Sequence, residues 1–411
     1  MNKFNCEVIL LHLSLIDGIG PVAIKKILQY SREASFNLQD LYTLKQTDFS
    51  NLFGFAKNVA HKLYLGLKDI SLLEREAGLI GKHNIRFVTV LSKEYPELLK
   101  HIHAPPPVLY IKSENNENIL CHNKKIAFVG SRKAHRYGEQ FIERVIPQVT
   151  KHNWLVVSGG AIGADSMAHR QTVESGGQTI SVIGSGLLHP YPHSNKKLFE
   201  KIIESGGALV SPFKLETVAR PGNFPARNRV IAGLSLGCVV VQAAKKSGAS
   251  ITAQFALDQG REVFAVPGPI DDELSLGCHT LIQQGAKLVS CAEDILCEFA
   301  GYLSPKVALN QKEQKNKNNT KTQDKNTKIL EIAKSLQSKP KIIQTTSAQS
   351  VKYASNSIEH AILTCCAKQS CAIEEIAVVV NKSIHELHEI LFDMQLSGDI
   401  KQNHAGMFER V

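Results

Sequence analysis

Two stretches of sequence decide the fold: IAFVGSR at residues 126–132 and LVVSGGAIGAD at residues 155–165. Each begins with a short apolar run, as a buried strand does, and then passes into a glycine-rich turn. A helical pattern follows each turn, the first one beginning near Tyr137. A strand, a glycine-rich turn and a helix in that order are typical of the βα units of a doubly wound parallel sheet.

The same alternation continues outward from these two units. Segments with helical spacing separate most of the short apolar runs, and Phe141, Val145, Ile146 and Val149 form one such helical face. We therefore predict an α/β fold over residues 121–300, an extended Rossmann-like doubly wound parallel sheet. Strands are predicted at residues 126–129, 155–157, 179–183, 208–210, 238–241, 262–266 and 287–289.

Residues 1–70 are predicted to form an N-terminal helical domain of the helix-hairpin-helix or SAM-like kind. The turn Asp17-Gly18-Ile19-Gly20-Pro21 resembles a helix-hairpin-helix turn, and residues 53–56 resemble a degenerate second copy. Glycines permit the tight turn, and the N–H groups at the start of the next helix can hold a phosphate. A purely structural helical hairpin explains the pattern equally well. Residues 71–120 are predicted to be a connector with a strand at 86–90.

The C-terminal quarter of the chain divides into a linker and a small domain. Residues 303–354 are rich in Lys, Asn, Gln, Thr and Ser, which predicts a disordered linker. Residues 355–411 are predicted to form a winged-helix domain, because three apolar helical patterns precede a hairpin pattern. The third helix, residues 383–396, carries Glu386, Glu389 and Asp393, and this acidity favours an accessory role over insertion into a DNA groove.

The net charge of +10 suggests a polyanionic partner. The linker, however, holds 11 Lys, no Arg and 3 acidic residues, a net +8, so the overall charge says little about a folded binding groove. Nine cysteines occur without a CxxC pair or a matching His cluster, so we expect reduced, packed thiols and no zinc site. No run of about 18 apolar residues and no signal-peptide pattern occurs, which predicts a cytoplasmic protein without a membrane span.

The glycine-rich turns and two further segments carry the chemistry. Glycine lets the backbone approach a phosphate closely, the following helix offers N–H donors, and Arg132 adds a charged, bidentate donor. FPARNRVIAGLS at residues 224–235 places Arg227 and Arg229 two positions apart at a helix start, where they cannot share one face well. SGASITA at residues 247–253 opens another helix. We predict that these segments form an anion-binding edge of the sheet.

The sequence lacks the motifs that nucleotide binding or catalysis would require. No G-x-G-x-x-G follows the first strand and no Walker lysine loop is present, so neither dinucleotide nor ATP binding is predicted. Asp165 is interpreted as a helix-start residue rather than a catalytic acid. Aromatic residues make up only 6% and Trp154 begins a buried strand, so phosphate contacts rather than stacking are expected to carry most of the affinity. We predict no catalytic residue, no metal site and no cofactor.

A series of motifs resembles, in order and spacing, the DprA (Smf) family of DNA-processing proteins. The resemblance is strong over residues 120–300 and looser at both ends. It implies an extended Rossmann core that binds single-stranded DNA, protects incoming DNA and forms homodimers. It also implies delivery of RecA recombinase onto single strands during natural transformation or recombination, with single-strand-binding protein as a further partner. The matching residues are Gly130-Ser131-Arg132, Ser158-Gly159-Gly160-Ala161, Tyr191-Pro192 with Asn195, residues 224–235, 247–253 and 263–268, Gly277 and residues 281–286.

The resemblance and the local patterns together give a candidate DNA site with no catalytic member. Some positions depart from the family: Pro212 and Gln242 replace frequent acidic residues, which weighs against acid-dependent chemistry, and Ala164 and His279 are further departures. The candidate DNA-binding residues are Gly130, Ser131, Arg132, Ser158, Gly159, Gly160, Lys214, Arg220, Arg227, Asn228, Arg229, Ser247 and Gly248.

Two alternative functions compete with this interpretation. Rossmann-like nucleotide phosphoribohydrolases share a strand-to-Ser-Gly-Gly turn, but their later Pro-Gly-Gly-x-Gly-Thr-x-x-Glu segment is missing, and Pro267-Gly268-Pro269 is unrelated to it. A regulator that binds double-stranded DNA would instead use the winged helix for DNA and the Rossmann domain as a ligand sensor. Competition between single- and double-stranded oligonucleotides distinguishes this second alternative from a protein that binds single-stranded DNA.

Overall fold

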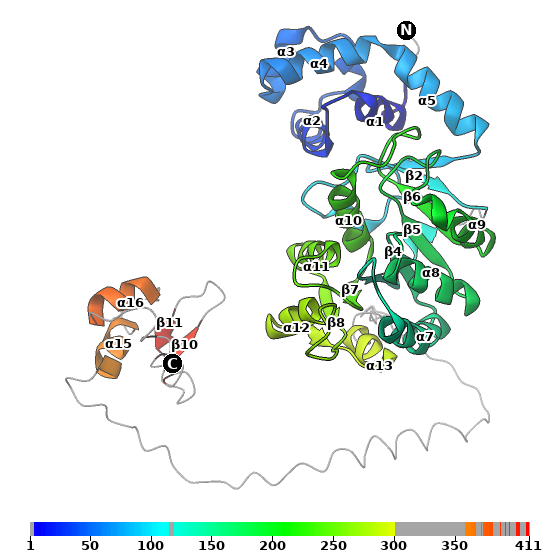
Figure 1. Cartoon of the computed structure of the whole chain (residues 1–411). Coiled ribbons are helices and arrows are strands. Elements are labelled where there is room, and N and C mark those ends of the chain that lie inside the picture. The colour runs from blue at the N-terminus through cyan, green and yellow to red at the C-terminus, as the bar shows by residue number, and fades with distance from the viewer. Residues whose placement is uncertain are drawn as a thin grey trace, which may run out of the picture. The chain divides into compact units, whose positions relative to one another are not determined.

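The structure is a computed structural model of the 411-residue chain (Figure 1). The chain forms two compact units, Met1–Leu309 and Asn310–Val411. The structure describes residues 4–114, 119–300, 358–366, 371, 373–380, 387, 391, 394, 400–402 and 408–410. Within these residues, no helix combines the length and the apolar character that a bilayer crossing requires.

Short helices build the N-terminal part of the first unit. α1 (Cys6–Leu15) begins after Asn5, whose side chain accepts a hydrogen bond from the Val8 N–H at 2.8 Å. Two turns that each join successive helices contain a glycine in the left-handed region. Gly18, at φ +82°, follows α1, and Gly54, at φ +60°, lies between residues 46–53 and 57–68, which are both helical. Both turns lie where the sequence predicted them. The remaining helices are α2 (Pro21–Glu33), η1 (Leu38–Tyr42), α3 (Gln46–Phe53), α4 (Lys57–Lys68) and α5 (Ile70–Lys82).

One nine-stranded sheet forms the centre of the described part of this unit. Its order is β1-β2-β6-β5-β4-β3-β7-β8-β9, and all neighbours from β6 to β9 are parallel. Each of the seven strands predicted between residues 126 and 289 is present, with ends within one residue of the prediction. The strands are β1 (Arg86–Thr89), β2 (Val108–Lys112), β3 (Lys125–Val129), β4 (Leu155–Ser158), β5 (Thr179–Val182), β6 (Ala208–Ser211), β7 (Gly237–Val240), β8 (Glu262–Ala265) and β9 (Lys287–Leu288).

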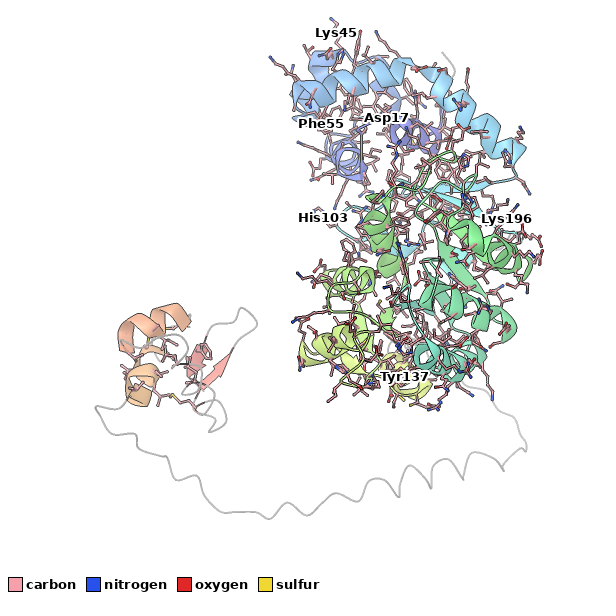
Figure 2. The ribbon with its side chains drawn as sticks, in the orientation of Figure 1. Asp17, Lys45, Phe55, His103, Tyr137 and Lys196 are labelled. Carbon is pink, nitrogen blue, oxygen red and sulfur yellow. The ribbon has the colours of Figure 1, made fainter. Side chains whose placement is uncertain are left out.

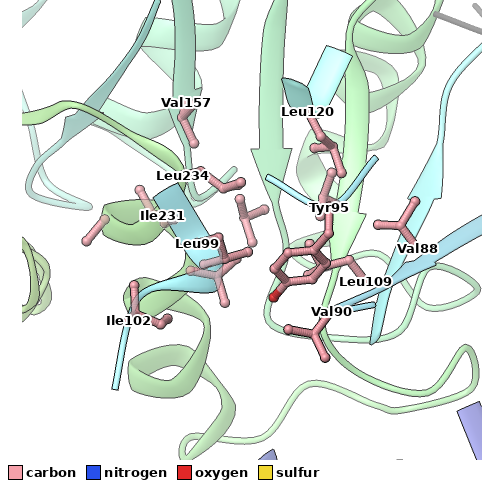
Figure 3. Close-up of a cluster of buried hydrophobic side chains, with 14 of the residues drawn as sticks. Val88, Val90, Tyr95, Leu99, Ile102, Leu109, Leu120, Val157, Ile231 and Leu234 are labelled. Carbon is pink, nitrogen blue, oxygen red and sulfur yellow. The ribbon is translucent and has the colours of Figure 1, made fainter. Parts of the chain in front are cut away.

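Two antiparallel strands extend the sheet, so it is mixed rather than wholly parallel as predicted. β1 pairs with β2, and β2 pairs with β6, both antiparallel. Both strands come from the segment that the sequence suggested as a connector. Their side chains enter the central core: Val88 and Leu109 lie close to the Tyr95 and Leu99 cluster shown in Figure 3. Tyr95 also donates a hydrogen bond to the Pro106 carbonyl at 2.7 Å, which holds the proline-rich turn against this core.

Helices cover both faces of the sheet, as a doubly wound fold requires. On one face, α10 (Asn223–Leu234) and α11 (Gly248–Asp258) pack Ile231 and Ala253 in the cluster that contains Val157 of β4. On the other face, α7 (Arg136–Lys151) packs Val145 in the cluster that contains Phe128 of β3. The other helical elements are α6 (Glu97–Lys100), η2 (Ile119–Cys121), α8 (Ala164–Glu174), η3 (His193–Asn195), α9 (Lys196–Glu204), α12 (Leu276–Gln283), α13 (Ala292–Leu296) and η4 (Cys297–Phe299).

The strand order reverses at β3, which places a crevice there. β4 follows β3 along the chain and lies on one side of it, whereas β7 lies on the other side. The connections that leave β3 and β7 therefore run to opposite sides of the sheet. In open α/β sheets, ligands bind outside the carboxyl ends of the strands at such a switch point.

The described part of the second unit contains α15 (Ile358–Cys366), α16 (Ile373–Val380), β10 (Ile400–Gln402) and β11 (Phe408–Arg410). β10 and β11 pair antiparallel, which agrees with the predicted hairpin, and α15 and α16 agree with the first two predicted helices. Leu387, Leu391 and Met394 are helical and buried in the core of this unit. The predicted linker, residues 303–354, and most of the predicted third helix lie outside the described residues.

Candidate nucleic-acid interface

A pocket of about 210 Å³ opens at the switch point. We call it the switch-point pocket. The turn after β3 and the first turns of α10 and α11 form its walls, and seven of the thirteen candidate residues line it: Gly130, Ser131, Arg132, Arg227, Asn228, Ser247 and Gly248. The volume lies below the roughly 300–1,000 Å³ of pockets for drug-sized ligands and suits a group of phosphate size.

The turn after β3 is held in place by its neighbours. The Ser131 N–H donates to the Gln242 carbonyl at 2.7 Å, and the Ser131 carbonyl accepts from the Ala164 N–H at 3.1 Å. A Cβ at Gly130 would lie 2.6 Å from the Ala164 Cβ, so glycine is required for this close approach. Arg132 is exposed, and its guanidinium carbon lies 5.3 Å from the centre of the Phe224 ring. Arg132 is therefore a charged group at the mouth of the pocket.

The turn after β4 contributes Ala161 to the pocket lining, whereas Ser158, Gly159 and Gly160 are not among the lining residues. The Ser158 hydroxyl donates to the Phe128 carbonyl at 2.6 Å, which joins β4 to β3. Gly160 has φ +68° and its carbonyl accepts from the Asn195 amide at 3.0 Å. The Ser158 side chain and the backbone of the two glycines therefore support the turn rather than line the pocket.

Arg227 is buried although it lines the pocket. It is 4% exposed, and its guanidinium donates to the carbonyl oxygens of Gly159 and Val182. Its Nε donates to the Asn228 Oδ1 at 3.1 Å. Gly159 directly follows β4, and Val182 is the last residue of β5. Arg227 therefore connects α10 to the carboxyl ends of both strands.

Burial dominates the electrostatics around Arg227. Burial lowers the pKa of Arg227 to about 10, and the Asp165 carboxylate opposes that shift, so Arg227 is protonated at neutral pH. Burial raises the pKa of Asp165, with Arg227 opposing the shift. His169 has a pKa lowered to about 3, first by burial and then by the Arg227 charge, so it is neutral. Arg227 is engaged with backbone carbonyl oxygens, whereas Arg132 is the exposed positive charge at the pocket mouth.

Three other candidates lie elsewhere. Lys214, Arg220 and Arg229 line a second hollow of about 530 Å³, between the turn after α1 and the segment after β6. Lys214 forms an ion pair at 2.6 Å with Asp17. Figure 2 labels Asp17 near the helices of the N-terminal part. Arg227 and Arg229 therefore face different hollows, which confirms the prediction that they do not share one face.

The start of α11 completes the switch-point pocket. The Ser247 hydroxyl accepts from the Ser250 N–H at 3.2 Å and caps the helix. The Asn228 side chain donates to the Gly248 carbonyl at 3.3 Å and links α10 to this helix start. The first N–H groups of an α-helix have no intrahelical acceptor, and the helix dipole favours a negative charge there. The first turn of α11 is therefore suited to hold an anion.

An aromatic surface at the pocket was missed from the sequence. Phe224 lines the pocket, and its ring centre lies 6.0 Å from that of Tyr191, which is 43% exposed. The low aromatic content of the chain concealed this pair, because composition does not show which rings meet. The position of Phe224 beside the two arginines of its helix was the available signal.

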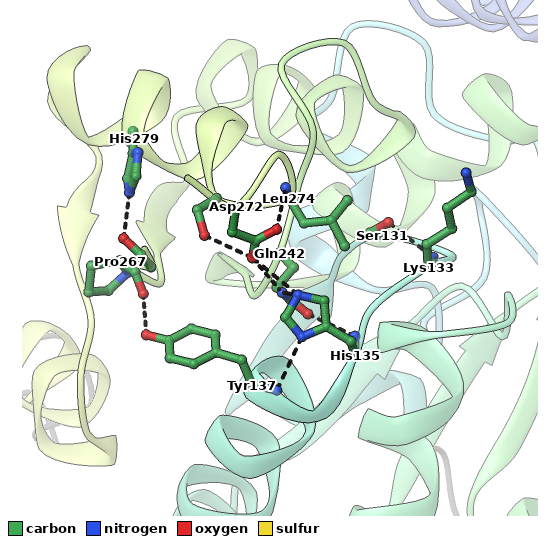
Figure 4. Close-up of polar contacts among 11 residues, drawn as sticks. Ser131, Lys133, His135, Tyr137, Gln242, Pro267, Asp272, Leu274 and His279 are labelled. Carbon is green, nitrogen blue, oxygen red and sulfur yellow. Dashed lines mark hydrogen bonds and ion pairs between the residues drawn. The ribbon is translucent and has the colours of Figure 1, made fainter. Parts of the chain in front are cut away.

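A polar network supports the turn after β3 from the β8 side (Figure 4). The Gln242 Oε1 accepts from the His135 N–H at 3.1 Å, and the Asp272 carboxylate lies 3.1 Å from the His135 Nε2. Tyr137 donates to the Pro267 carbonyl at 2.5 Å. Gln242 thus has a structural partner at the position where the family often has glutamate. Among the described residues, no group of three or more His, Cys, Asp or Glu side chains is arranged to hold a metal ion.

These features define a class of protein: a doubly wound α/β protein with a small, positively charged pocket at the switch point. The family model described as DNA recombination-mediator protein A matches residues 86–300. This match includes β1 and β2 as well as the parallel strands. The chain belongs to the DNA recombination-mediator protein A family.

Individual relatives extend the similarity. The DNA processing protein DprA of Bacillus subtilis is 40% identical over 243 residues, which cover 59% of this chain and 79% of that protein. The DNA processing protein DprA of Streptococcus pneumoniae is 37% identical over 279 residues, covering 63% of this chain and 97% of that protein. The solved structure of DNA processing protein A from Streptococcus pneumoniae has a TM-score of 0.62 at 34% identity, covering 72% of this chain and 98% of that chain.

Proposed function

We propose that this protein binds single-stranded DNA in the switch-point pocket and acts in DNA processing during recombination or natural transformation. The observation that carries the proposal is the convergence of the exposed Arg132, the turn after β3 and the first turn of α11 on one phosphate-sized space. Membership of a recombination-mediator family supports the choice of DNA over other polyanions.

Binding would combine phosphate and base contacts. Arg132 offers a bidentate donor to a phosphate, and the start of α11 offers N–H groups to the same anion. The Phe224 ring, half-buried beside Arg132, offers a face on which a base can stack. Phosphate contacts carry no sequence information, so we expect binding to be largely independent of sequence. A base can stack on Phe224 only when it is released from a duplex, which favours single strands.

We propose a binding role rather than an enzymatic one. The carboxylate that lines the pocket, Asp165, is 7% exposed, accepts from the Ala161 N–H at 3.3 Å and lies beside Arg227. A carboxylate that accepts from the Ala161 N–H supports the turn after β4, and this structural role weighs against its acting as a catalytic acid. We expect no release of free base from nucleoside monophosphates.

The wider role rests on the family. We propose a cytoplasmic homodimer that protects incoming DNA and delivers RecA recombinase onto the bound strand, with single-strand-binding protein as a further partner. Lys214, Arg220 and Arg229 are proposed to contact the strand beyond the pocket. The second unit is proposed to be a winged helix with an accessory role, which the order α15, α16 and the β10–β11 hairpin supports.

The test is competition at fixed salt. A labelled single-stranded oligonucleotide bound to the full chain is challenged with unlabelled single- or double-stranded oligonucleotides of the same sequence. We expect the single strand to compete far better, and the Arg132→Ala variant to bind both more weakly. Equal or better competition by the duplex would overturn the proposal in favour of a double-strand-binding regulator.

A further inference from the structure

Three of the nine cysteines gather in the second unit. Cys365 and Cys366 end α15, and Cys371 follows five residues later, before α16 begins. The spacing matches neither a CxxC pair nor a zinc ligand pattern, so the sequence predicted only packed thiols. The proposed DNA function makes no use of this cluster.

The Cys371 thiol contacts both of the others, and one of these contacts is a hydrogen bond with the Cys366 thiol. The Sγ atoms of Cys365 and Cys371 lie 3.2 Å apart, and the Cys371 thiol also faces the Cys365 carbonyl oxygen at 3.6 Å. A disulfide bond is about 2.05 Å long, so the two sulfurs need to approach by only about 1.2 Å. Side-chain rotation provides a movement of this size without moving the backbone far.

The surroundings give the thiols different roles. Cys365 is half-buried and can be reached from solvent, whereas Cys371 is 2% exposed. Burial raises the pKa of the Cys366 thiol, which disfavours the reactive thiolate there. Two core cysteines, Cys238 and Cys278, have a pKa raised by burial to about 12 and are still less reactive. Cys365 is therefore the thiol that a dissolved oxidant can reach. Cys371 is the buried neighbour that can then attack the oxidised Cys365 sulfur.

We propose that Cys365 and Cys371 form a redox-active pair that is oxidised by a low-molecular-weight disulfide such as oxidised glutathione. The Cys365 thiolate attacks the glutathione disulfide, forms a mixed disulfide and releases one glutathione thiolate. The Cys371 thiol then loses its proton and attacks the Cys365 sulfur, which releases the second glutathione. Two protein thiols are oxidised to one disulfide, one glutathione disulfide is reduced to two thiols, and the two protons end on the glutathiones.

The bond would connect α15 to the hairpin. The Cys371 N–H donates to the Phe408 carbonyl at 2.9 Å, and the Phe408 N–H donates to the Cys371 carbonyl at 2.8 Å. Because Phe408 begins β11, a Cys365–Cys371 disulfide links the end of α15 through this backbone pair to the strand. In a reducing compartment the pair is a dithiol, and the bond forms in response to an oxidant.

The test uses the full-length protein in glutathione buffers of rising oxidised fraction, followed by alkylation, denaturation and trypsin digestion. Lys368 lies between the two cysteines, so the disulfide joins peptide 353–368 to peptide 369–382. We expect this linked pair in the wild type, its retention in Cys366→Ser, and its loss in Cys365→Ser and on treatment with dithiothreitol.

Two results overturn the proposal. One is an undiminished linked pair in Cys365→Ser, which would assign the bond to Cys366. The other is a wild-type protein without the linked pair under conditions where the exposed Cys6, Cys121 and Cys297 become glutathionylated. This second arm needs no variant, so it decides the question even if a substitution disturbs the fold of the unit.

Discussion

Arg132 and Arg227 line the same pocket but differ greatly in solvent exposure. Arg132 is exposed. Arg227 is 4% exposed, and its guanidinium donates hydrogen bonds to the carbonyl oxygens of Gly159 and Val182. A guanidinium with backbone acceptors on its donors has few donors left for a phosphate. We therefore propose that Arg132 contacts the phosphate and that Arg227 positions the turns.

Replacing Arg132 by alanine should weaken binding to single strands of every sequence. The slope of log K against log salt should fall by about 0.7, the contribution of one single-strand phosphate contact. Fluorescence anisotropy titrations at several salt concentrations measure both quantities. Arg136→Ala is the matched control, because Arg136 is exposed nearby but paired with Glu139 at 3.0 Å and Glu143 at 3.3 Å. Identical slopes for the two variants would refute the assignment of Arg132.

Replacing Arg227 by alanine should lower stability as well as affinity. The change removes the donors to the buried carbonyl oxygens of Gly159 and Val182, and each buried acceptor left unpaired costs about 1–3 kcal/mol. Urea unfolding measures the loss. The exposed Arg220 provides the control, and Arg220→Ala should change the free energy of unfolding by less than about 0.5 kcal/mol. A fully stable Arg227→Ala variant that no longer binds DNA would instead assign Arg227 a direct contact.

His169 should make stability depend on pH. Burial and the Arg227 charge lower its pKa from 6.5 to about 3 in the folded state, so below pH 6.5 the unfolded chain binds the extra proton. Stability should therefore fall as pH falls from 6.5 toward 3, by up to about 1.4 kcal/mol per pH unit. Unfolding curves across this range should show a smaller slope for His169→Asn, whereas substitution of the exposed His189 should leave the slope unchanged.

At the scale of elements, the turn between β4 and α8 depends on its glycines. Gly163 has φ +83°, and a Cβ there would lie 2.4 Å from the Ser131 carbonyl oxygen. Gly163→Ala should therefore lower stability by about 1–3 kcal/mol and displace the turn after β3, which weakens DNA binding. Thermal unfolding and anisotropy measure the two effects. Gly222→Ala, where a Cβ would meet no atom within 4 Å, should change neither, and an equal loss there would contradict the steric explanation.

Sequence patterns predicted the parallel strands well, because strands buried on both faces are continuous apolar runs that a local pattern reveals. The same patterns did not predict that β1 and β2 extend the sheet. Their position depends on the pairing of Tyr110 with Ser211, a contact between residues far apart in the chain.

The site was predictable in part for a similar reason. The two-residue spacing predicted that Arg227 and Arg229 diverge, but the burial of Arg227 depends on carbonyl oxygens at the ends of β4 and β5. Likewise, the chemistry of Lys214 and Arg220 gave no sign that they line a different hollow from Arg132.

At the scale of the whole molecule, the pocket belongs entirely to the first compact unit, Met1–Leu309. Removal of residues 310–411 should therefore leave most of the single-strand affinity intact at moderate salt. Removing the Lys-rich segment should chiefly affect binding at low salt, because exposed charges are screened as salt rises. Anisotropy with the truncated chain tests this, and loss of most of the affinity at moderate salt would place the principal contacts in the removed part.

The switch point also has a consequence for synthesis of the protein. The turn with Arg132 and the helix start at Ser247 meet in one pocket, yet more than 100 residues separate them in the chain. On the ribosome, a nascent chain that ends before α11 carries the arginine but has no complete pocket, because the first turn of α11 forms one of its walls. The complete pocket, and with it the proposed ability to hold a strand, therefore arises only after α11, which ends at Asp258, has been translated.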